Sequence, residues 1–386
     1  SSVLGLNCGD DDAPVAPTGG GSEPLSFNDF QDASVVVGQV NKTSGGQNAG
    51  GTAGPIGLNS PAGAGAGSFY IPDTFNHRIL GYTEIPTADG EAADFVVGQP
   101  DFTTVVSGTT SQNFNLTSDC VASGGKLFLA DGSNHRVLIW NTLPTANTPA
   151  SVVVGQADFT SSGSALTQAG FSLPFRVFVA GGKLFVGDLN NRRVLVWNSI
   201  PTTNGEAADV VVGQADFTSN VNALTAAGMN GPRAIWSDGT RLVVSDAGNR
   251  RVLIWNSIPT TNGQAADVVV GAPDFTTAGS ATASATTIDG AWGVASDGTS
   301  LFVADTFNNR ITVFTPFPTT NGAAAVGVLG QSNFTNETRN DANQDGVADA
   351  NPTARTLWGP TGLKVIGDRL VVADQSNHRM LIFESN

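Results

Sequence analysis

The sequence predicts an all-β fold, a six-bladed β-propeller of four-stranded blades, from two repeats that run in phase along the chain. The first repeat reads apolar strand, Asp, two residues, Asn, one residue, Arg and a second apolar strand. It occurs six times, at spacings of 57–59 residues and of 69 before the last copy. The second repeat is a Val-rich segment that mostly ends in Gly-Gln. The aspartates of the first repeat are Asp73, Asp131, Asp188, Asp246, Asp305 and Asp374, and its arginines are Arg78, Arg136, Arg193, Arg251, Arg310 and Arg379.

Each unit contains four short runs rich in Val, Ile, Phe and Trp, separated by Gly, Asn, Asp and Pro. One run is the Val-rich segment, another starts after a Pro or Gly and ends at Asp-Gly or Gly-Gly, and two flank the Asp-to-Arg turn. Helical i, i+4 periodicity is absent. Four strands in each of six units favour a closed propeller over a linear solenoid, which would need capping repeats at its ends.

The two ends of the repeat region predict how the ring closes. The first element is the strand Val35–Gln39, which starts a unit, and the last is Arg379–Ser385, which ends a unit without a Val-rich strand of its own. An N-terminal strand that completes the C-terminal blade removes two exposed sheet edges. We therefore assign residues 33–386 to the propeller and the Gly-, Pro- and Asp-rich residues 1–32 to an extended N-terminal arm.

The D-x-x-N-[HNR]-R hairpins, together with P-x-G-[VL] segments such as Pro360-Thr361-Gly362-Leu363, resemble NHL repeats over about residues 33–386. The resemblance implies a six-bladed propeller. The units here are longer than is usual for that family, and they carry a Gly-Gln-x-Asp-Phe-Thr extension such as Gln156–Thr160 as a variation on its pattern. Propellers host binding modules, lyases and hydrolases, so the resemblance does not fix the function.

Composition excludes several classes of partner. Lys and Arg number 18 against 33 Asp and Glu, which gives a net charge of −15. Nucleic acids and anionic membrane surfaces are bound through basic patches, so we expect neither as a partner. No apolar run reaches 18 residues, so we expect no transmembrane span.

The polar residues of the Asp-to-Arg turn are expected to be structural. His77, His135 and His378 share one turn position that the other units fill with Arg or Asn, so we expect that position to face solvent. The chain then lacks the converging nitrogen or sulfur donors of a zinc site. The Asp and Arg recur in every unit, whereas a ring needs at most one active site. We expect the carboxylates to accept turn N–H groups and the arginines to pair with carboxylate or carbonyl oxygens.

Residues that differ between the blades are the candidates for function. Asp119, Arg176, Arg233 and Trp292 lie near the start of the innermost strands and are expected at a mouth of the central channel. Two arginines and an aromatic ring suit a carboxylate ligand, while the alternative is that these side chains merely fill the channel. Trp236 and Trp358 are further candidates. No G-x-S-x-G elbow is present, and no nucleophile stands beside an evident base.

The longest unit carries an insertion at about residues 336–353 that matches D-x-N-x-D-G-x-x-D, the pattern of a calcium loop. Alternate oxygen ligands and a sharp turn at Gly346 suit Ca²⁺, although Pro352 replaces the glutamate that would end an EF-hand loop. The alternative is a polar surface turn without metal. The expected calcium ligands are Asp341, Asn343, Asp345, the carbonyl of Val347 and Asp349.

The two cysteines leave three alternatives open. Cys120 falls on an innermost strand and is expected to be buried, while Cys8 lies in the arm. A Cys8–Cys120 disulfide would tie the arm to the ring and stabilise it by up to about 4–5 kcal/mol. Lipidation of Cys8 would anchor the chain to a membrane, and two unrelated thiols are the third alternative.

The low charge, the calcium-like loop and the polar surface favour a secreted or cell-surface protein, and we expect Ser1 to follow a removed signal peptide. The favoured function is a non-catalytic propeller that binds a protein or glycan and assembles with itself through the arm, as a subunit of a surface or filamentous structure. One alternative is a hydrolase or lyase with its site at the channel mouth. The other is a propeller that binds a small ligand.

Overall fold

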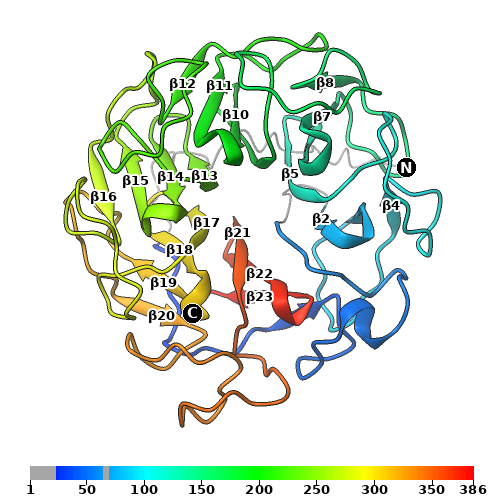
Figure 1. The fold of residues 1–386 in the computed structure, drawn as a ribbon. Coiled ribbons are helices and arrows are strands. Elements are labelled where there is room, and N and C mark those ends of the chain that lie inside the picture. The colour runs from blue at the N-terminus through cyan, green and yellow to red at the C-terminus, as the bar shows by residue number, and fades with distance from the viewer. Residues whose placement is uncertain (1–22, 64–68) are drawn as a thin grey trace, which may run out of the picture.

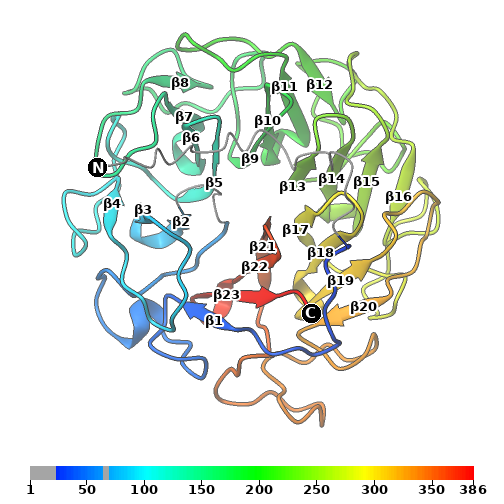
Figure 2. The ribbon, with the colours of Figure 1, turned by 180° about the vertical axis from the view of Figure 1, so that it is seen from behind.

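In the computed structural model, which describes residues 23–63 and 69–386, six antiparallel sheets stand around a central axis (Figure 1). Figure 2 views the same ring from its other face. Neighbouring sheets pack against one another as the blades of a propeller. The predicted all-β, six-bladed fold is therefore confirmed. No helix in the described part of the chain is long and apolar enough to cross a membrane.

The strands run outward from the axis in chain order, and β1 forms the outer strand of blade 6. Blade 1 contains β2 (Phe69–Asp73), β3 (Arg78–Tyr82) and β4 (Phe95–Val97), and blade 2 contains β5 (Thr117–Ser123), β6 (Lys126–Asp131), β7 (Arg136–Trp140) and β8 (Val152–Val154). Blade 3 contains β9 (Pro174–Ala180), β10 (Lys183–Asp188), β11 (Arg193–Trp197) and β12 (Val210–Val212). Blade 4 contains β13 (Pro232–Ser237), β14 (Leu242–Asp246), β15 (Arg251–Trp255) and β16 (Val268–Val270). Blade 5 contains β17 (Ala291–Ser296), β18 (Leu301–Asp305), β19 (Arg310–Phe314) and β20 (Gly327–Leu329), and blade 6 contains β21 (Pro360–Ile366), β22 (Arg369–Asp374), β23 (Arg379–Glu384) and β1 (Val35–Val37).

A single 3-10 turn joins the Asp-bearing strand of each blade to the strand that follows it. These turns mark one face of the ring, which we call the turn face; the innermost strands begin there, because they run antiparallel to the Asp-bearing strands. A further 3-10 turn, η1 (Gln47–Gly50), follows β1. The turns of the six blades are η2 (Thr74–Asn76), η3 (Gly132–Asn134), η4 (Leu189–Asn191), η5 (Ala247–Asn249), η6 (Thr306–Asn308) and η7 (Gln375–Asn377).

Five blades have the four strands that the sequence predicts, and blade 1 has three within the described residues. The exception lies at its inner edge, where Pro61 forms an isolated bridge with Asp73 and residues 64–68 are outside the described ranges. The predicted ring closure is confirmed. Strand β1 pairs with β23, with Val36 opposite Leu381.

The core consists of six apolar clusters, and each lies between two neighbouring blades. Successive side chains of a strand point to opposite faces, so each strand contributes to two clusters. Strand β1 shows the consequence for closure. Val35 and Val37 pack in the cluster between blades 6 and 1, whereas Val36 packs in the cluster between blades 5 and 6. This one short strand therefore seals two interfaces of the ring.

The repeated Asp and Arg form a fully buried ion pair in every blade, as blade 3 illustrates. Asp188 accepts hydrogen bonds from Nε of Arg193 at 2.8 Å and from the backbone N–H of Ser172 at 2.6 Å. Burial raises the pKa of Asp188 to about 6, while the Arg193 guanidinium opposes that shift. The remaining Arg193 donors reach the carbonyl oxygens of Phe217, Thr167 and Gly170. The predicted structural role of these residues is confirmed, although the N–H groups come from the preceding loop rather than from the turn itself.

The Gly-Gln-x-Asp-Phe-Thr extension gains an explanation in this network. In blade 2, Nε2 of Gln156 donates to the carbonyl oxygens of His135 and Gly163, at 3.0 and 2.8 Å. The carbonyl oxygen of Phe159 accepts a bond from Arg136, and Asp158 accepts the N–H of Thr160 to tighten the loop. The extension therefore folds the outer loop back onto the buried arginine.

The histidine position is half-buried and links neighbouring blades, so the prediction that it simply faces solvent is wrong. His77, His135 and His378 adopt positive φ angles of 52–53° and close the 3-10 turns. Nδ1 of each accepts a backbone N–H from the next blade around the ring, at 3.0–3.1 Å. In blade 5 the Oδ1 atom of Asn309 accepts the N–H of Gly359 in the same way. The sequence missed this role because the acceptor bond reaches a loop about 40 residues away or, for His378, the opposite end of the chain.

The described part of the predicted arm packs on the ring. The ring of Phe27 lies 5.8 Å from that of Phe302, and the N–H of Phe30 donates to the carbonyl oxygen of Val328 at 3.1 Å. Residues 1–22, with Cys8, lie outside the described ranges.

Replacing Asp188 by Asn leaves the shape of the turn unchanged but removes the buried negative charge that compensates Arg193. We expect the free energy of unfolding at pH 7.5, measured in urea, to fall by about 3–5 kcal/mol. The matched control is Asp158→Asn, because Asn333 already closes the equivalent loop in blade 5 with the same bonds. Equal stability of the Asp188→Asn variant and the wild type would contradict a structural role for the pair.

Burial lowers the pKa of His77, His135 and His378 below the ordinary value near 6.5. Because the folded-state pKa lies below the unfolded one, the three bonds stabilise the ring above about pH 6.5, and their contribution is lost as the pH falls through the folded-state pKa. We expect the triple His→Asn variant to lose less stability than the wild type between pH 7 and pH 5 in urea unfolding. Parallel losses in the two proteins would show that the histidine bonds do not matter.

Candidate functional site

The central channel is crossed near the turn face by one buried guanidinium, that of Arg176 on β9. Its donors reach innermost-strand segments of other blades, so a single side chain touches most of the ring. The innermost strands bring these oxygens together only because the ring closes. The acceptors are the carbonyl oxygens of Arg233 (2.7 Å), Ala62 (2.7 Å), Trp292 (2.8 Å) and Thr361 (3.3 Å).

Asp119 on β5 supplies the charge that compensates Arg176. One carboxylate oxygen lies 3.3 Å from the guanidinium, and the other accepts the N–H of Val177 at 3.1 Å. Burial raises the pKa of Asp119 and lowers that of Arg176, and in each case the partner's charge opposes the shift. With the carbonyl bonds, this pair joins the innermost segments of all six blades.

Arg233 and Trp292 stack next to the Arg176–Asp119 pair, which we call the plug. The Arg233 guanidinium lies 3.9 Å from the centre of a Trp292 ring and 4.9 Å from that of Phe175. Burial lowers the pKa of Arg233 to about 10, and repulsion from Arg176 adds to the shift. The cation therefore lies close to two aromatic rings that are nearly perpendicular to each other, an attractive arrangement in its own right.

The structure thus brings the four predicted channel residues together, within one group at the turn-face end of the channel. Arg176 and Asp119 are engaged with each other and with backbone groups, while Arg233 and Trp292 stack on each other. This arrangement matches the channel-filling alternative more closely than an open carboxylate site. Binding of a ligand by these residues stays a prediction.

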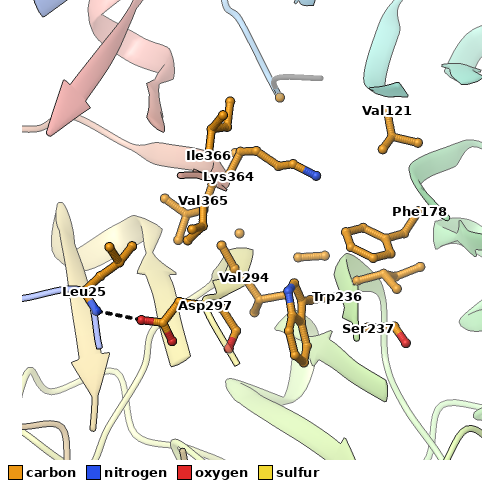
Figure 3. A pocket seen from close by; sticks show the side chains of 18 of the residues that line it. Leu25, Val121, Phe178, Trp236, Ser237, Val294, Asp297, Lys364, Val365 and Ile366 are labelled. Carbon is orange, nitrogen blue, oxygen red and sulfur yellow. Dashed lines mark hydrogen bonds between the residues drawn. The ribbon is translucent and has the colours of Figure 1, made fainter. Parts of the chain in front are cut away.

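On the other side of this plug the channel widens into a chamber of about 710 Å³. Figure 3 shows its wall, where Lys364 and Phe178 approach each other across the channel, with the Nζ atom 5.4 Å from the ring centre. Val121, Trp236 and Val294 add apolar surface. Such a chamber has the size of a small-molecule pocket. Among the described residues, no histidine lines it.

A second cavity of about 610 Å³ lies off the axis on the turn face, between blades 5 and 6; we call it the aromatic cleft. Phe307 at η6 is 57% exposed, and Trp358 is 37% exposed. The ring centres of Trp292 and Phe307 lie 5.5 Å apart, which joins the cleft to the plug. The Arg339 guanidinium lies 4.3 Å from the centre of the Trp358 ring. Exposed aromatic rings flanked by a cation form a typical recognition surface.

The predicted calcium loop borders this cleft, because Ala348 of the insertion lines it. Asp341 accepts the N–H of Gly346 at 2.8 Å, and Asp349 accepts the N–H of Ala342 at 2.9 Å. Gly346 has the positive φ that the sharp turn requires. Within the described ranges, no three Asp, Glu, His or Cys side chains gather as a metal site. The carboxylates bond to the loop backbone here, and calcium binding stays a prediction.

Cys120 is buried as expected, with its Sγ atom 3.6 Å from the carbonyl oxygen of Tyr70, and it lines the chamber. Its proposed partner, Cys8, lies outside the described residues, so the disulfide and the lipid anchor also stay predictions.

Sequence reasoning found Trp292 and named Trp358 as a candidate, but it missed Phe307 and Arg339. Phe307 carried a usable signal, since only blades 1 and 5 place a Phe at that turn position, where the other blades have small or polar residues. Arg339 carried none, because its position against Trp358 depends on how the insertion folds.

Comparisons with known proteins concern the fold. No protein-family model and no curated protein matches the chain. Among solved structures, the WD40 β-propeller domain of Doa1 is similar at 7% identity and a TM-score of 0.46, covering 94% of this chain and 97% of that one. The computationally designed Ika8 protein is similar at 8% identity and a TM-score of 0.43, covering 92% of this chain and all of that one. The resemblance to NHL repeats stays a prediction from the repeats themselves.

Proposed function

We propose that this chain is a non-catalytic extracellular propeller of NHL-like repeats that binds a protein or glycan partner and assembles with itself. The aromatic cleft carries the proposal. It presents Phe307 and Trp358 to solvent beside Arg339, on the face where the Asp-to-Arg turn recurs in every blade. Aromatic residues and arginine are the side chains that most often dominate binding energy at interfaces.

The contacts of the charged channel residues also favour binding over catalysis. Arg176 and Asp119, which would be the obvious charged groups of an active site, hold the innermost strands together. In the described residues, no histidine lines either cavity, which leaves an acid–base mechanism without its commonest group. Binding at the cleft requires no such group.

Calcium fits this function as a structural ion. We propose that it binds through side-chain oxygens of Asp341, Asn343, Asp345 and Asp349 and the carbonyl of Val347, and so stiffens the insertion that borders the cleft. Millimolar free calcium outside cells suits a loop without the closing glutamate of an EF-hand.

Loss of the cleft aromatics should weaken self-association without harming the fold, because both side chains are exposed. We expect the Phe307→Ser, Trp358→Ser double variant to associate at least tenfold more weakly in sedimentation velocity, with an unchanged melting temperature. Phe75→Ser is the matched control, since Phe75 occupies the equivalent turn position in blade 1 and is 53% exposed. Association at the wild-type strength in the double variant would contradict the proposed function.

Calcium at 100 times its dissociation constant should stabilise the protein by about 2.7 kcal/mol, visible as a rise in melting temperature that chelation reverses. The Asp341→Asn, Asp345→Asn variant should lose this response, whereas Asp368→Asn, an exposed change outside the loop, should keep it. No response to millimolar calcium in the wild type would rule the site out.

A further inference from the structure

The described residues of the arm and the aromatic cleft lie on opposite faces of the ring. The first described residues meet the carboxyl ends of β17 and β23. The N–H of Leu25 donates to Asp297, just beyond β17, at 2.8 Å (Figure 3). The N–H of Ser26 donates to the Ser385 hydroxyl, just beyond β23, at 2.9 Å. We call this the terminal face. Trp292 is the second residue of β17, so it stands at the other end of the same strand. The described part of the arm therefore begins on the face that does not carry the cleft.

The arm has the sequence of a ligand for an aromatic groove. Residues 10–17 read Asp-Asp-Asp-Ala-Pro-Val-Ala-Pro, in which Pro14 and Pro17 form a P-x-x-P motif directly after an acidic run. Such segments favour the polyproline II helix, which docks on aromatic-lined grooves at a small entropic cost because it is already extended. The acidic run sets the additional requirement for basic groups at one end of the groove.

The cleft meets both requirements. Exposed Phe307 and Trp358 supply ring faces for prolines, and Arg339 stacks on the Trp358 ring as a cation. Basic groups are scarce in this chain, with 18 against 33 acidic ones, and six of the arginines are buried in the repeated ion pairs. A cleft that presents Arg339 is therefore an unusual place on an acidic protein, and its positive charge complements three consecutive aspartates.

The arm cannot reach the cleft of its own ring. Six residues from Pro17 to Glu23 span at most about 20 Å. A path from the terminal face to the cleft would have to run around the outer edge of blade 5. It would cross three strand spacings outward, one strand length and three strand spacings inward, which is roughly 50 Å. The direct path along the channel is closed by Arg176 and its bonds to the innermost strands.

We propose that residues 10–17 of one copy bind the aromatic cleft of the next copy. This inference rests on the proposed self-assembling function and names the partner of the cleft. An arm on one face and its receptor on the opposite face make a heterologous contact, which joins copies head to tail. Two copies stacked this way cannot exchange arms reciprocally, so the contact generates an open row of propellers.

Two complementary full-length variants test the direction of this contact. The donor carries Phe307→Ser and Trp358→Ser and keeps its arm, while the acceptor carries Pro14→Gly and Pro17→Gly and keeps its cleft. We expect each variant alone to be monomeric in sedimentation velocity and at least tenfold weaker in association than the wild type, and an equimolar mixture to form dimers and nothing longer. An acceptor that assembles like the wild type, or a mixture without dimers, would overturn the proposal.

A labelled peptide of residues 9–19 identifies the segment directly. It should bind the acceptor variant, and binding should weaken at least tenfold when Trp358→Ala is added, but not when Phe75→Ala is added. Replacing Asp10, Asp11 and Asp12 by Asn should weaken binding of the peptide at low salt. It should have little effect on binding at 1 M salt, where charges are screened over about 3 Å. Equal binding with and without Trp358 would overturn the proposal. If the donor variant is monomeric while the acceptor assembles, the cleft mediates assembly with a different segment: the proposed function then stands and the arm proposal fails.

Discussion

The buried ion pair between Asp and Arg sets the geometry on which every blade depends. Removing two charges from water is costly, so the pair is tolerable only if each donor and acceptor is satisfied. Arg193 meets that condition by binding its own turn, the loop before the innermost strand and the extension after the outer strand. One side chain thereby joins the inner and outer parts of a blade. Because the buried Asp–Arg pair occurs in all six blades, the blades share the same backbone arrangement at the turn face.

Function is then expected where blades depart from that framework. Blades 5 and 6 depart most, with Phe307 in the turn, Trp358 before β21 and the insertion between them. The axis of the ring offers less free surface for binding on the turn face, because the Arg176–Asp119 pair joins the innermost strands and closes the channel there. The position of the cleft off the axis follows from this division, since the centre of the ring is needed to hold it together.

The two faces of the ring differ because the chain enters and leaves on the same one. Strand β1 must pair with β23 to close the ring, which places both ends of the propeller segment on the terminal face. The turn face is left to the 3-10 turns and the cleft. Contacts between such unlike faces join copies head to tail, into a closed ring or an open row, whereas contacts between like faces stop at a dimer.

The sequence by itself determined the all-β class, the six units and the closure by Val35–Gln39, because strand patterns and the Asp-to-Arg turns are local and repeat in phase. It also separated the structural Asp and Arg from candidates that differ between blades. Only the tertiary structure decided that Arg176 closes the channel, that His77, His135 and His378 link neighbouring blades, and that Phe307, Trp358 and Arg339 share a cleft. The physical reason is distance along the chain: these contacts join residues that the closed ring brings together, and no local pattern encodes which loops become neighbours.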